Sequence, residues 1–257
     1  MQKISNNQIK ELAGLKQKKH QKIEKKILVE GVRLIKQLLN YKTEFDCLIC
    51  DVTKTDVLNQ TDLDAANIPL FTAESFQIKK LSSTETPQPL IGVVKKKHLP
   101  IKKTSFLLYL DSISEAGNLG TIFRTAAALG IDGIVLSPGC CDIYNAKAIR
   151  ASMGSVFSVP SEVWAPSCLN DFKGKKIATI IEGGENLYQT EFTSEDIVLI
   201  IGSEAHGIRN EILEQADIKL SIPMKGAMES LNAVTAAGIA MSYLKYCRDF
   251  PINEIRK

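Results

Sequence analysis

The chain has 257 residues, of which 44% are hydrophobic and 24% charged, and its formal net charge is +3. These values are typical of a globular protein with a large core, and the length predicts two domains. No apolar run reaches the ~18 residues that a membrane-spanning helix needs. The first six residues also lack the apolar core of a signal peptide, so we expect a cytoplasmic protein with no membrane partner.

The first 95 residues predict an alternating α/β unit. Apolar residues at helical spacing predict helices at 6–19, 31–40 and 74–81, and a fourth, uncertain helix near 61–66. Short apolar runs predict strands at 27–29, 45–51, 69–72 and 90–95. This unit contains no recognisable chemical constellation. Its Arg33 is open to two interpretations, a phosphate contact or a surface ion pair.

The lysines are unevenly spread along the chain. Residues 1–26 hold eight lysines against two glutamates, and a second cluster lies within Lys95 to Lys103. A single lysine run is usually a solvated face, but two runs in one part of a near-neutral chain favour a polyanionic partner. No aromatic platform accompanies them, so base stacking is not indicated. The segment Lys95 to Lys103 also contains Pro100 and has a linker composition, so we expect domains at 1–98 and 104–257.

The cysteines predict reduced thiols and no metal site. Cys47 and Cys50 form a C-x-x-C inside an apolar run, where strand positions three apart face opposite sides. A closed zinc site needs four ligands, and no second pair follows at zinc spacing. We therefore expect no bound metal.

The second unit predicts a parallel sheet covered on both faces, because strands and helices alternate. Strands are expected at 106–111, 133–137, 156–159, 176–181, 196–201 and 218–222. Helices are expected at 121–129, 145–153, 209–215 and 230–248, with a weak one at 167–172. Polar, glycine-containing loops follow the strands that end near 201 and 222. Loops at the carboxyl ends of strands form the crevice in which open α/β sheets bind ligands.

Asn118 and Arg124 are the first candidate site residues. They flank the expected start of a helix, where Gly117 and Gly120 allow a ligand to approach the backbone and the helix end favours an anion. Arg124 lies in a mostly apolar stretch, and a buried arginine needs a partner. The alternative is a plain strand–turn–helix corner with Arg124 on the surface. The sequence contains neither the dinucleotide-binding nor the P-loop glycine pattern.

The other candidates follow the last two strands. Glu204, between Gly202 and Gly207, is either a substrate contact or a polar turn residue; His206 has no companion residues that would make it a general base. Ser230 is expected to cap the long C-terminal helix, which explains Ser230 without a catalytic role. Capping leaves Asn232 unexplained, because asparagine is a mediocre residue in a first helical turn.

Taken together, these segments resemble the SpoU (TrmH-like) family of RNA 2′-O-ribose methyltransferases, within the SPOUT class. Three motifs in order carry the resemblance: N-L-G-T-I-F-R-T-A at 118–126, I-I-G-S-E-A-H-G-I at 200–208 and I-P-M-K-G-A-M-E-S-L-N-A at 222–233. The segments at 28–33 and 84–89 are similar to the accessory RNA-binding domain of this family, which has a ribosomal-protein-like α/β fold.

The resemblance implies a C-terminal SPOUT α/β domain with a deep trefoil knot, a homodimer, and S-adenosylmethionine as cofactor. By position, Gly202, Ile222 and Leu231 would contact the cofactor, with Met224 and Ile181 lining its adenine pocket. Arg124 would orient or deprotonate the ribose hydroxyl. The residues that would position Arg124 and the ribose are Asn118, Glu204, Ser230 and Asn232.

The RNA target is expected to be ribosomal rather than transfer RNA, although a transfer-RNA 2′-O-methyltransferase and a non-catalytic RNA-binding protein remain alternatives. Two departures from the family pattern bear on this. The turn before Asn118 reads E-A-G where many relatives have an acidic residue and proline, and His20 stands where relatives often carry arginine. Neither departure falls on a proposed catalytic position.

Overall fold

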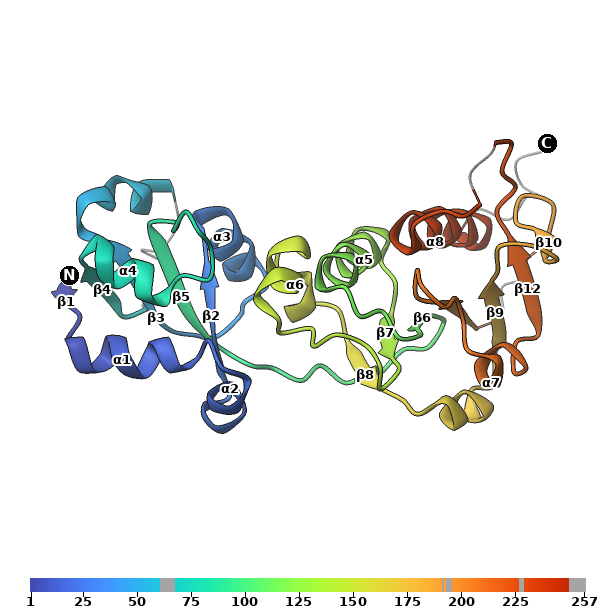
Figure 1. Ribbon diagram of the computed structural model, residues 1–257, viewed down its shortest axis with the longest axis horizontal. Coiled ribbons are helices and arrows are strands. Elements are labelled where there is room, and N and C mark those ends of the chain that lie inside the picture. The colour runs from blue at the N-terminus through green and yellow to red at the C-terminus, as the bar shows by residue number, and fades with distance from the viewer. Residues whose placement is uncertain (61–67, 191, 193–195, 227–228, 250–257) are drawn as a thin grey trace. The chain divides into compact units, whose positions relative to one another are not determined.

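A computed structural model describes residues 1–60, 68–190, 192, 196–226 and 229–249. The chain divides into two compact units, unit 1 at Met1–Lys97 and unit 2 at His98–Lys257 (Figure 1). The uncertain helix expected near 61–66 lies outside the described residues.

Unit 1 is built on a five-stranded mixed sheet with the strand order β1-β4-β3-β5-β2. Its strands are β1 (Gln2–Lys3), β2 (Lys26–Glu30), β3 (Phe45–Asp51), β4 (Leu70–Ala73) and β5 (Leu90–Lys95). Its helices are α1 (Asn6–Gly14), α2 (Lys18–Glu24), α3 (Val32–Asn40) and α4 (Ser75–Leu81), with a 3-10 segment at Val52–Gln60. The core between the sheet and helices α1 and α4 contains Ile9, Ile49, Ile78, Leu81 and Ile91.

The single helix predicted at 6–19 is wrong, because the chain forms α1 and α2 with a break between them. A capping box begins α1, in which Ser5 accepts from the Gln8 amide and the Gln8 side chain accepts from the Ser5 amide. After Gly14 the helix ends, and the Gln21 side chain donates to the carbonyl of Leu15 at 2.8 Å. Glycine disfavours helix continuation, and this bond satisfies one of the carbonyls left at the helix end.

Unit 2 is built on a seven-stranded sheet, in which every recorded strand pair is parallel, with the order β10-β12-β9-β11-β6-β7-β8. Its strands are β6 (Phe106–Leu110), β7 (Gly133–Leu136), β8 (Ser161–Val163), β9 (Lys175–Thr179), β10 (Glu185–Asn186), β11 (Ile197–Ile201) and β12 (Ile218–Ser221). Its helices are α5 (Ala116–Leu129), α6 (Ala146–Ala151), α7 (Asn210–Leu213) and α8 (Ala233–Asp249), with 3-10 helices at Ser155–Phe157 and Pro166–Asp171.

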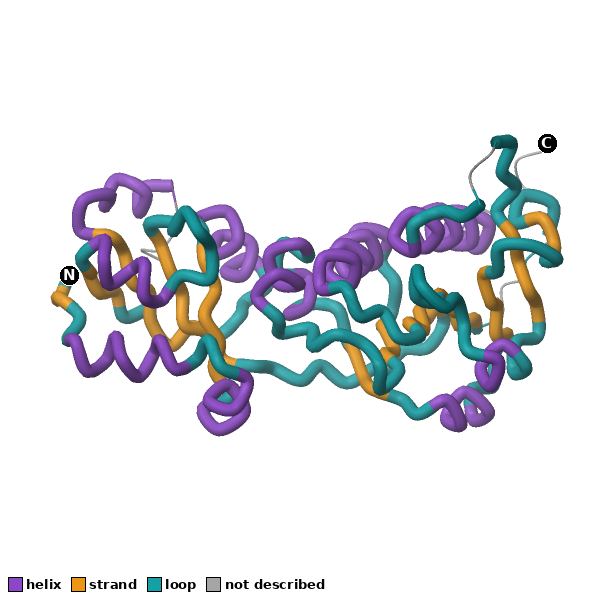
Figure 2. Tube along the Cα trace, viewed as in Figure 1, coloured by secondary structure: helices purple, strands orange, loops and turns teal. Residues whose placement is uncertain are grey.

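The sheet of unit 2 lies between two helical layers, as the alternating pattern predicts. Helix α5 packs against α6 and α8 on one face (Figure 2). On the other face α7 and the 3-10 helix Pro166–Asp171 cover a core that contains Leu107, Tyr109, Val198 and Ile200. The fully buried strands β6 and β11 pair residue by residue at the middle of the sheet, which explains their continuous apolar sequences.

Several predicted elements of unit 2 are wrong at their ends or in type. The expected strand at 156–159 is a 3-10 helix at Ser155–Phe157, and the strand that follows is β8. A short buried apolar run fits either element, and Gly154 at φ 82° turns this one into a helical turn. The weak helix at 167–172 is also of the 3-10 type. Within the described part of the chain, no helix is both long and apolar enough to cross a membrane.

Candidate active site

A pocket of about 380 Å³ lies where β9, β11 and β12 end. Its lining comes from three stretches of chain and from Leu213 of α7. The stretches contribute residues 179–182, seven residues within 201–208, and residues 222, 224, 230, 231, 233 and 236. These stretches follow neighbouring parallel strands, so their carboxyl ends meet at one edge of the sheet. The expected crevice between the loops after 201 and 222 is therefore present.

All five residues that the family resemblance assigns to cofactor binding line this pocket. They are Ile181, Gly202, Ile222, Met224 and Leu231. Ile181 is 56% exposed and Met224 is 37% exposed, which is high for apolar side chains beside a concave site. A ligand with an apolar face would cover both side chains and remove that surface from water.

The loop 202–208 forms one wall of the pocket and is tightly closed on itself. Ser203 and Gly207 exchange two backbone hydrogen bonds, of 3.1 and 2.9 Å. Gly207 adopts φ +64°, and a Cβ on Gly202 would lie 2.1 Å from the carbonyl carbon of Gly207. Glycine at both positions therefore permits a turn that other residues would strain or open.

The first candidate motif reaches this wall through Asn118. The Asn118 Nδ2 donates to Glu204 Oε1, which joins α5 to the loop 202–208. The helix expected at 121–129 begins five residues earlier, because α5 starts at Ala116 and the Glu115 side chain caps it through the Gly117 amide. Asn118 therefore lies in the first turn of α5.

Gly120, near the start of α5, has a packing role. A Cβ on Gly120 would lie 2.3 Å from the carbonyl oxygen of Ala148, so glycine is what allows α5 to approach α6 closely. Lys147 of α6 forms an ion pair with Glu115 at 2.6 Å, and this hydrogen bond is the main cause that lowers the pKa of Glu115. Packing against α6 thus sets where Asn118 stands.

Arg124 is exposed and lies outside the pocket lining. Of the two positions that the sequence leaves open for Arg124, the structure shows the surface one, and among the described residues the Arg124 side chain has no hydrogen bond or ion pair. Arg124 follows Asn118 by six positions. On an ideal α-helix that spacing places the two residues about 9 Å apart along the axis and roughly 120° apart around it. The structure therefore joins Asn118 to Glu204 at the pocket, but it does not place Arg124 in the pocket lining.

The third motif is arranged differently from the prediction. Helix α8 begins at Ala233, and Asn232 Oδ1 accepts from the Val234 amide at 2.9 Å, so Asn232 makes the cap contact predicted for Ser230. Asparagine is a strong capping residue, which explains Asn232 structurally. Ser230 is exposed and lines the pocket with Glu204 and His206. Capping therefore accounts for Asn232 and not for Ser230.

Comparison with known proteins identifies the family. The sequence profile of the SpoU rRNA Methylase family matches residues 105–242, and that of the MRM3-like substrate binding domain matches residues 6–92. The chain belongs to the SpoU rRNA methylase family.

Relatives that match nearly the whole chain support this assignment. The 23S rRNA (guanosine(2553)-2′-O)-methyltransferase RlmP of Bacillus subtilis is 30% identical over 95% of this chain and 98% of its own. A putative RNA methyltransferase of the TrmH family from Porphyromonas gingivalis has a TM-score of 0.82 and 29% identity, over 94% of this chain and 98% of that one. The AdoMet-bound rRNA methyltransferase of Sinorhizobium meliloti has a TM-score of 0.80 and 25% identity, over 97% of both chains.

In this family member, β2 and β5 bring the lysine clusters of unit 1 together. Lys26 lies opposite Lys95 in the antiparallel β2–β5 pair, and the Lys96 amide donates to the Lys25 carbonyl at 2.7 Å. Like charges directly opposite each other destabilise a sheet. Two ion pairs offset this repulsion. Lys26 pairs with Asp46 at 2.7 Å, and that hydrogen bond is the main cause that raises the pKa of Lys26, while Lys95 pairs with Glu44 at 3.1 Å.

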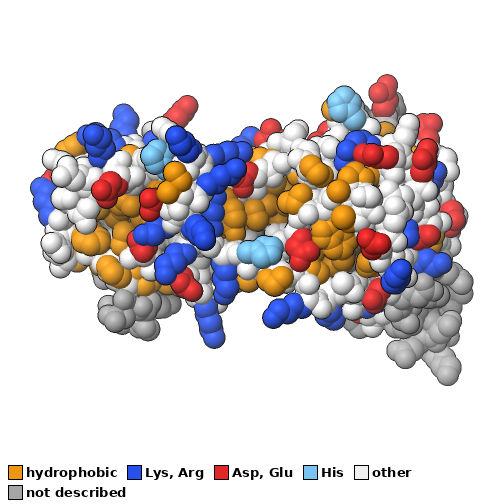
Figure 3. Space-filling view, turned by 90° about the horizontal axis from the view of Figure 1, so that it is seen from below, with side chains coloured by type: hydrophobic (Ala, Val, Ile, Leu, Met, Phe, Trp, Pro, Cys, Tyr) orange, Lys and Arg blue, Asp and Glu red, His pale blue; other side chains and the backbone are white. Residues whose placement is uncertain are grey.

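The lysines of α2 add to this cluster. Lys19, Lys22 and Lys25 are exposed, and within the described residues their side chains have no hydrogen bond or ion pair. We call the surface formed by these three residues and Lys95–Lys97 the lysine patch. Figure 3 shows lysine and arginine side chains gathered on this part of unit 1. Three uncompensated cations side by side favour a polyanion over a solvated face.

The sequence-based reasoning missed the residues that hold the pocket wall from behind. Asp111, which follows β6, and Arg209, which follows the loop 202–208, form an ion pair of 2.8 Å. A charged residue at the end of an all-apolar strand is a signal that could have found Asp111. Among the described residues, no group of three or more His, Cys, Asp or Glu could hold a metal ion.

Proposed function

We propose that this protein transfers a methyl group from S-adenosylmethionine to a ribose 2′-hydroxyl of RNA, and that its substrate is ribosomal RNA. The observation that carries the proposal is the pocket at the ends of β9, β11 and β12, which all five candidate cofactor residues line. The names of the relatives support the cofactor and the RNA class, since they describe an rRNA 2′-O-methyltransferase and an AdoMet-bound rRNA methyltransferase.

The residues at the pocket fit S-adenosylmethionine. Exposed Ile181 and Met224 offer apolar surface for an adenine ring, while Ser203, Glu204 and Ser230 offer polar groups at the same pocket. A volume of about 380 Å³ is within the usual range of small-molecule sites, roughly 300–1,000 Å³. When bound, the cofactor supplies an electrophilic methyl group. Gly202, Ile222 and Leu231 would hold it through backbone groups.

The remaining candidate residues act on the RNA in this proposal. A ribose hydroxyl is a poor nucleophile at neutral pH and has to be oriented toward the methyl group. Arg124 would orient the hydroxyl and an adjacent phosphate with its guanidinium fork. Asn118 would hold Glu204 in place, and Ser230 would face the ribose from the pocket wall. Asn232 would act through the start of α8.

We propose three further features that the family resemblance implies. Unit 2 is a homodimer-forming catalytic domain at 104–257, and its C-terminal segments form a trefoil knot around the pocket. The wrapping of one pocket by three separate chain segments and the return of α8 onto α5 support the knot. The exposed position of Arg124 supports a site completed by RNA and a second copy. Ribosomal RNA as substrate, together with free cysteines, favours the cytoplasm.

Unit 1 is, in this proposal, the RNA substrate-binding domain at 1–98. The match of residues 6–92 to a substrate binding domain and the lysine patch both support this role. Lysine contacts to phosphates supply affinity that is independent of sequence and falls steeply with salt. They would retain the RNA while unit 2 reads the target nucleotide.

The test is methyl transfer from labelled S-adenosylmethionine to ribosomal RNA, followed by nucleoside analysis. We expect label on a ribose. Arg124→Ala should lower kcat by about a hundredfold and leave cofactor affinity unchanged, since Arg124 lies outside the pocket lining. Lys175→Ala is the matched control, because it removes an exposed cation at the start of β9, at the far end of the strand from the pocket.

Two outcomes would contradict parts of the proposal. Equal transfer by the wild type and Arg124→Ala would remove Arg124 from the mechanism. A wild-type protein that binds ribosomal RNA but not S-adenosylmethionine would be a non-catalytic RNA-binding protein instead. Label on transfer RNA alone would move the substrate to that class.

A further inference from the structure

An ion pair behind the pocket, whose carboxylate is buried, holds both ends of the loop wall. Asp111 follows β6 and its side chain is 0% exposed, while that of Arg209 is 39% exposed. The Asp111 amide donates to the carbonyl of Ile201 at 2.8 Å, just before the loop 202–208. Its carboxylate accepts from the Arg209 amide and from Arg209 Nε, each at 2.9 Å, just after that loop.

Asp111 therefore fixes the two residues that flank the seven-residue loop 202–208. Six of the seven loop residues line the pocket: Gly202, Ser203, Glu204, His206, Gly207 and Ile208. The Ser203–Gly207 backbone pair closes the loop between these fixed ends. Little of the loop is then left free to move independently of β6.

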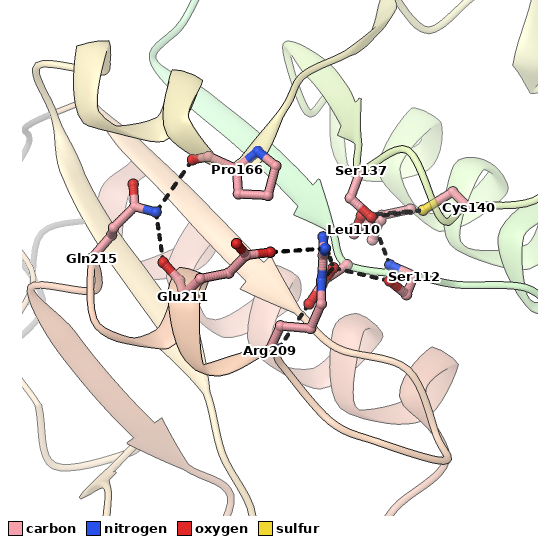
Figure 4. A network of polar contacts seen from close by, with 9 residues as sticks. Leu110, Ser112, Ser137, Cys140, Pro166, Arg209, Glu211 and Gln215 are labelled. Carbon is pink, nitrogen blue, oxygen red and sulfur yellow. Dashed lines mark hydrogen bonds and ion pairs between the residues drawn. The ribbon is translucent and has the colours of Figure 1, made fainter.

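Arg209 also ties this point to α7, for which it is the cap residue. Its guanidinium forms a second ion pair with Glu211 at 2.9 Å (Figure 4). The hydrogen bond to Asp111 is the main cause that raises the pKa of Arg209. On the other side of Asp111, Ser112 donates to the carboxylate at 3.2 Å and adopts φ 58°, in the left-handed region. The pair is thus held from two neighbouring elements.

Stability alone does not explain a pair of this kind. Burying the Asp111 carboxylate fully and the Arg209 side chain partly costs desolvation energy that their attraction often only balances. An apolar pair could fill the same volume, but it would not bond to a backbone amide at one fixed position. A directional pair adds a fixed position, and here it fixes the loop 202–208 relative to the end of β6.

We propose that Asp111 and Arg209 are positioning residues that preorganise the loop 202–208 for S-adenosylmethionine and that place Glu204 against Asn118. This inference rests on the proposed function. It follows that uncoupling the pair weakens cofactor binding, because the unliganded loop then samples conformations in which the pocket is not formed. Neither side chain lines the pocket, so each acts through the loop.

The experiment compares variants that do not leave one buried charge alone. Arg209→Met would strand Asp111 and could unfold the protein for that reason only. Asp111→Asn combined with Arg209→Gln keeps neutral polar groups of similar size and removes the charge and the guanidinium fork. We expect this double variant to raise the Kd for S-adenosylmethionine by about tenfold at a similar Tm. Arg209→Lys retains the charge but not the guanidinium fork, so its Kd for S-adenosylmethionine should lie between that of the wild type and that of the double variant.

Asp132 and Lys103 provide a matched control in the same unit. They form an ion pair at 3.1 Å, and Asp132 also accepts from the Phe106 amide at 2.9 Å, at the start of β6 rather than its end. Asp132→Asn with Lys103→Gln should leave the cofactor Kd unchanged. Hydrogen exchange at the Ser203 and Gly207 amides should accelerate only in the Asp111–Arg209 double variant, because each of these amides donates to the carbonyl of the other residue within the loop.

The outcomes separate this inference from the proposed function. If the Asp111–Arg209 double variant binds S-adenosylmethionine as tightly as the wild type, and hydrogen exchange at the Ser203 and Gly207 amides is unchanged, the positioning role is overturned and the proposed function stands. An equal loss of affinity in the Asp132–Lys103 control would also overturn it, because general destabilisation would then be the cause. A wild type that does not bind S-adenosylmethionine would overturn the proposed function, and the inference with it.

Discussion

Gly202→Ala places one methyl group in the tightest turn of the pocket wall. The new Cβ would lie 2.1 Å from the carbonyl carbon of Gly207, 2.3 Å from its oxygen and 2.4 Å from the Ile208 nitrogen. Ordinary contact begins near 3.4 Å, and all three atoms are backbone, so no side chain can rotate away. Gly207 would have to move by more than about 1 Å, as interiors are close-packed.

A movement of that size breaks the Ser203–Gly207 backbone pair, whose bonds are 3.1 and 2.9 Å long. Each such bond contributes about 1 kcal/mol, and overpacking a tight site costs roughly 1–3 kcal/mol. If about 2 kcal/mol of this falls on the bound state, the Kd for S-adenosylmethionine rises about thirtyfold. The remainder would appear as a Tm decrease of a few degrees.

Calorimetric titration of S-adenosylmethionine and a thermal scan of each variant measure the two effects separately. Gly238→Ala is the control, because a Cβ there meets no heavy atom within 4 Å and alanine favours the interior of α8. We expect the control to keep its affinity. A Gly202→Ala protein that binds the cofactor as tightly as the wild type would refute the close-approach reasoning.

Three further predictions concern surfaces and titrating groups. Replacing Lys19, Lys22 and Lys25 by glutamine should reduce the magnitude of the slope of log affinity for ribosomal RNA against log salt by about 2–3. The control replaces three other exposed lysines of unit 1, which are Lys54 in the 3-10 segment Val52–Gln60 and Lys79 and Lys80 in α4, and it should reduce the slope by less. Cys168 is exposed and should be alkylated before Cys47 and Cys50 at pH 8, because burial raises the pKa of each of these two thiols to about 11. Mass spectrometry of the alkylated protein over time measures the order, and modification of Cys47 or Cys50 before Cys168 would contradict the prediction. Burial raises the pKa of Tyr109 from 10.0 to about 12, so the unfolded chain loses that proton first, and the free energy of unfolding should fall between pH 10 and 12; Tyr109→Phe should flatten the fall.

Patterns that depend on burial were readable from the sequence. Phe106–Leu110 and Ile197–Ile201 are apolar without interruption, and they form β6 and β11, which lie side by side with strands on both flanks. A strand that is buried on both faces allows no polar residue until it ends. The polar residues after such strands therefore mark one sheet edge, which is why the crevice could be located before the fold was known, whereas the five cofactor residues were assigned only through the family resemblance.

Features that depend on contacts distant in sequence were not readable. The helix was expected to begin only at 121, after Gly117 and Gly120, since glycine is a poor helix former. The chain is helical there because α6 approaches so closely that only glycine fits beside Ala148, and no local pattern shows this. Arg124 has an apolar neighbourhood in sequence, yet it is exposed, since a helix turns successive residues through about 100°.

The pocket walls differ in a way that bears on how the cofactor would be recognised. The loop 202–208 is fixed by Asp111 at both ends and by its own backbone pair. The opposite walls carry Ile181 and Met224, whose side chains remain exposed. A fixed wall presents backbone groups without an ordering cost, and that favours selectivity. The apolar walls contribute affinity only when a ligand covers them. Substitutions in the fixed wall should therefore change which cofactor analogues bind, while Met224→Ala should weaken all analogues that retain the adenine ring to a similar degree.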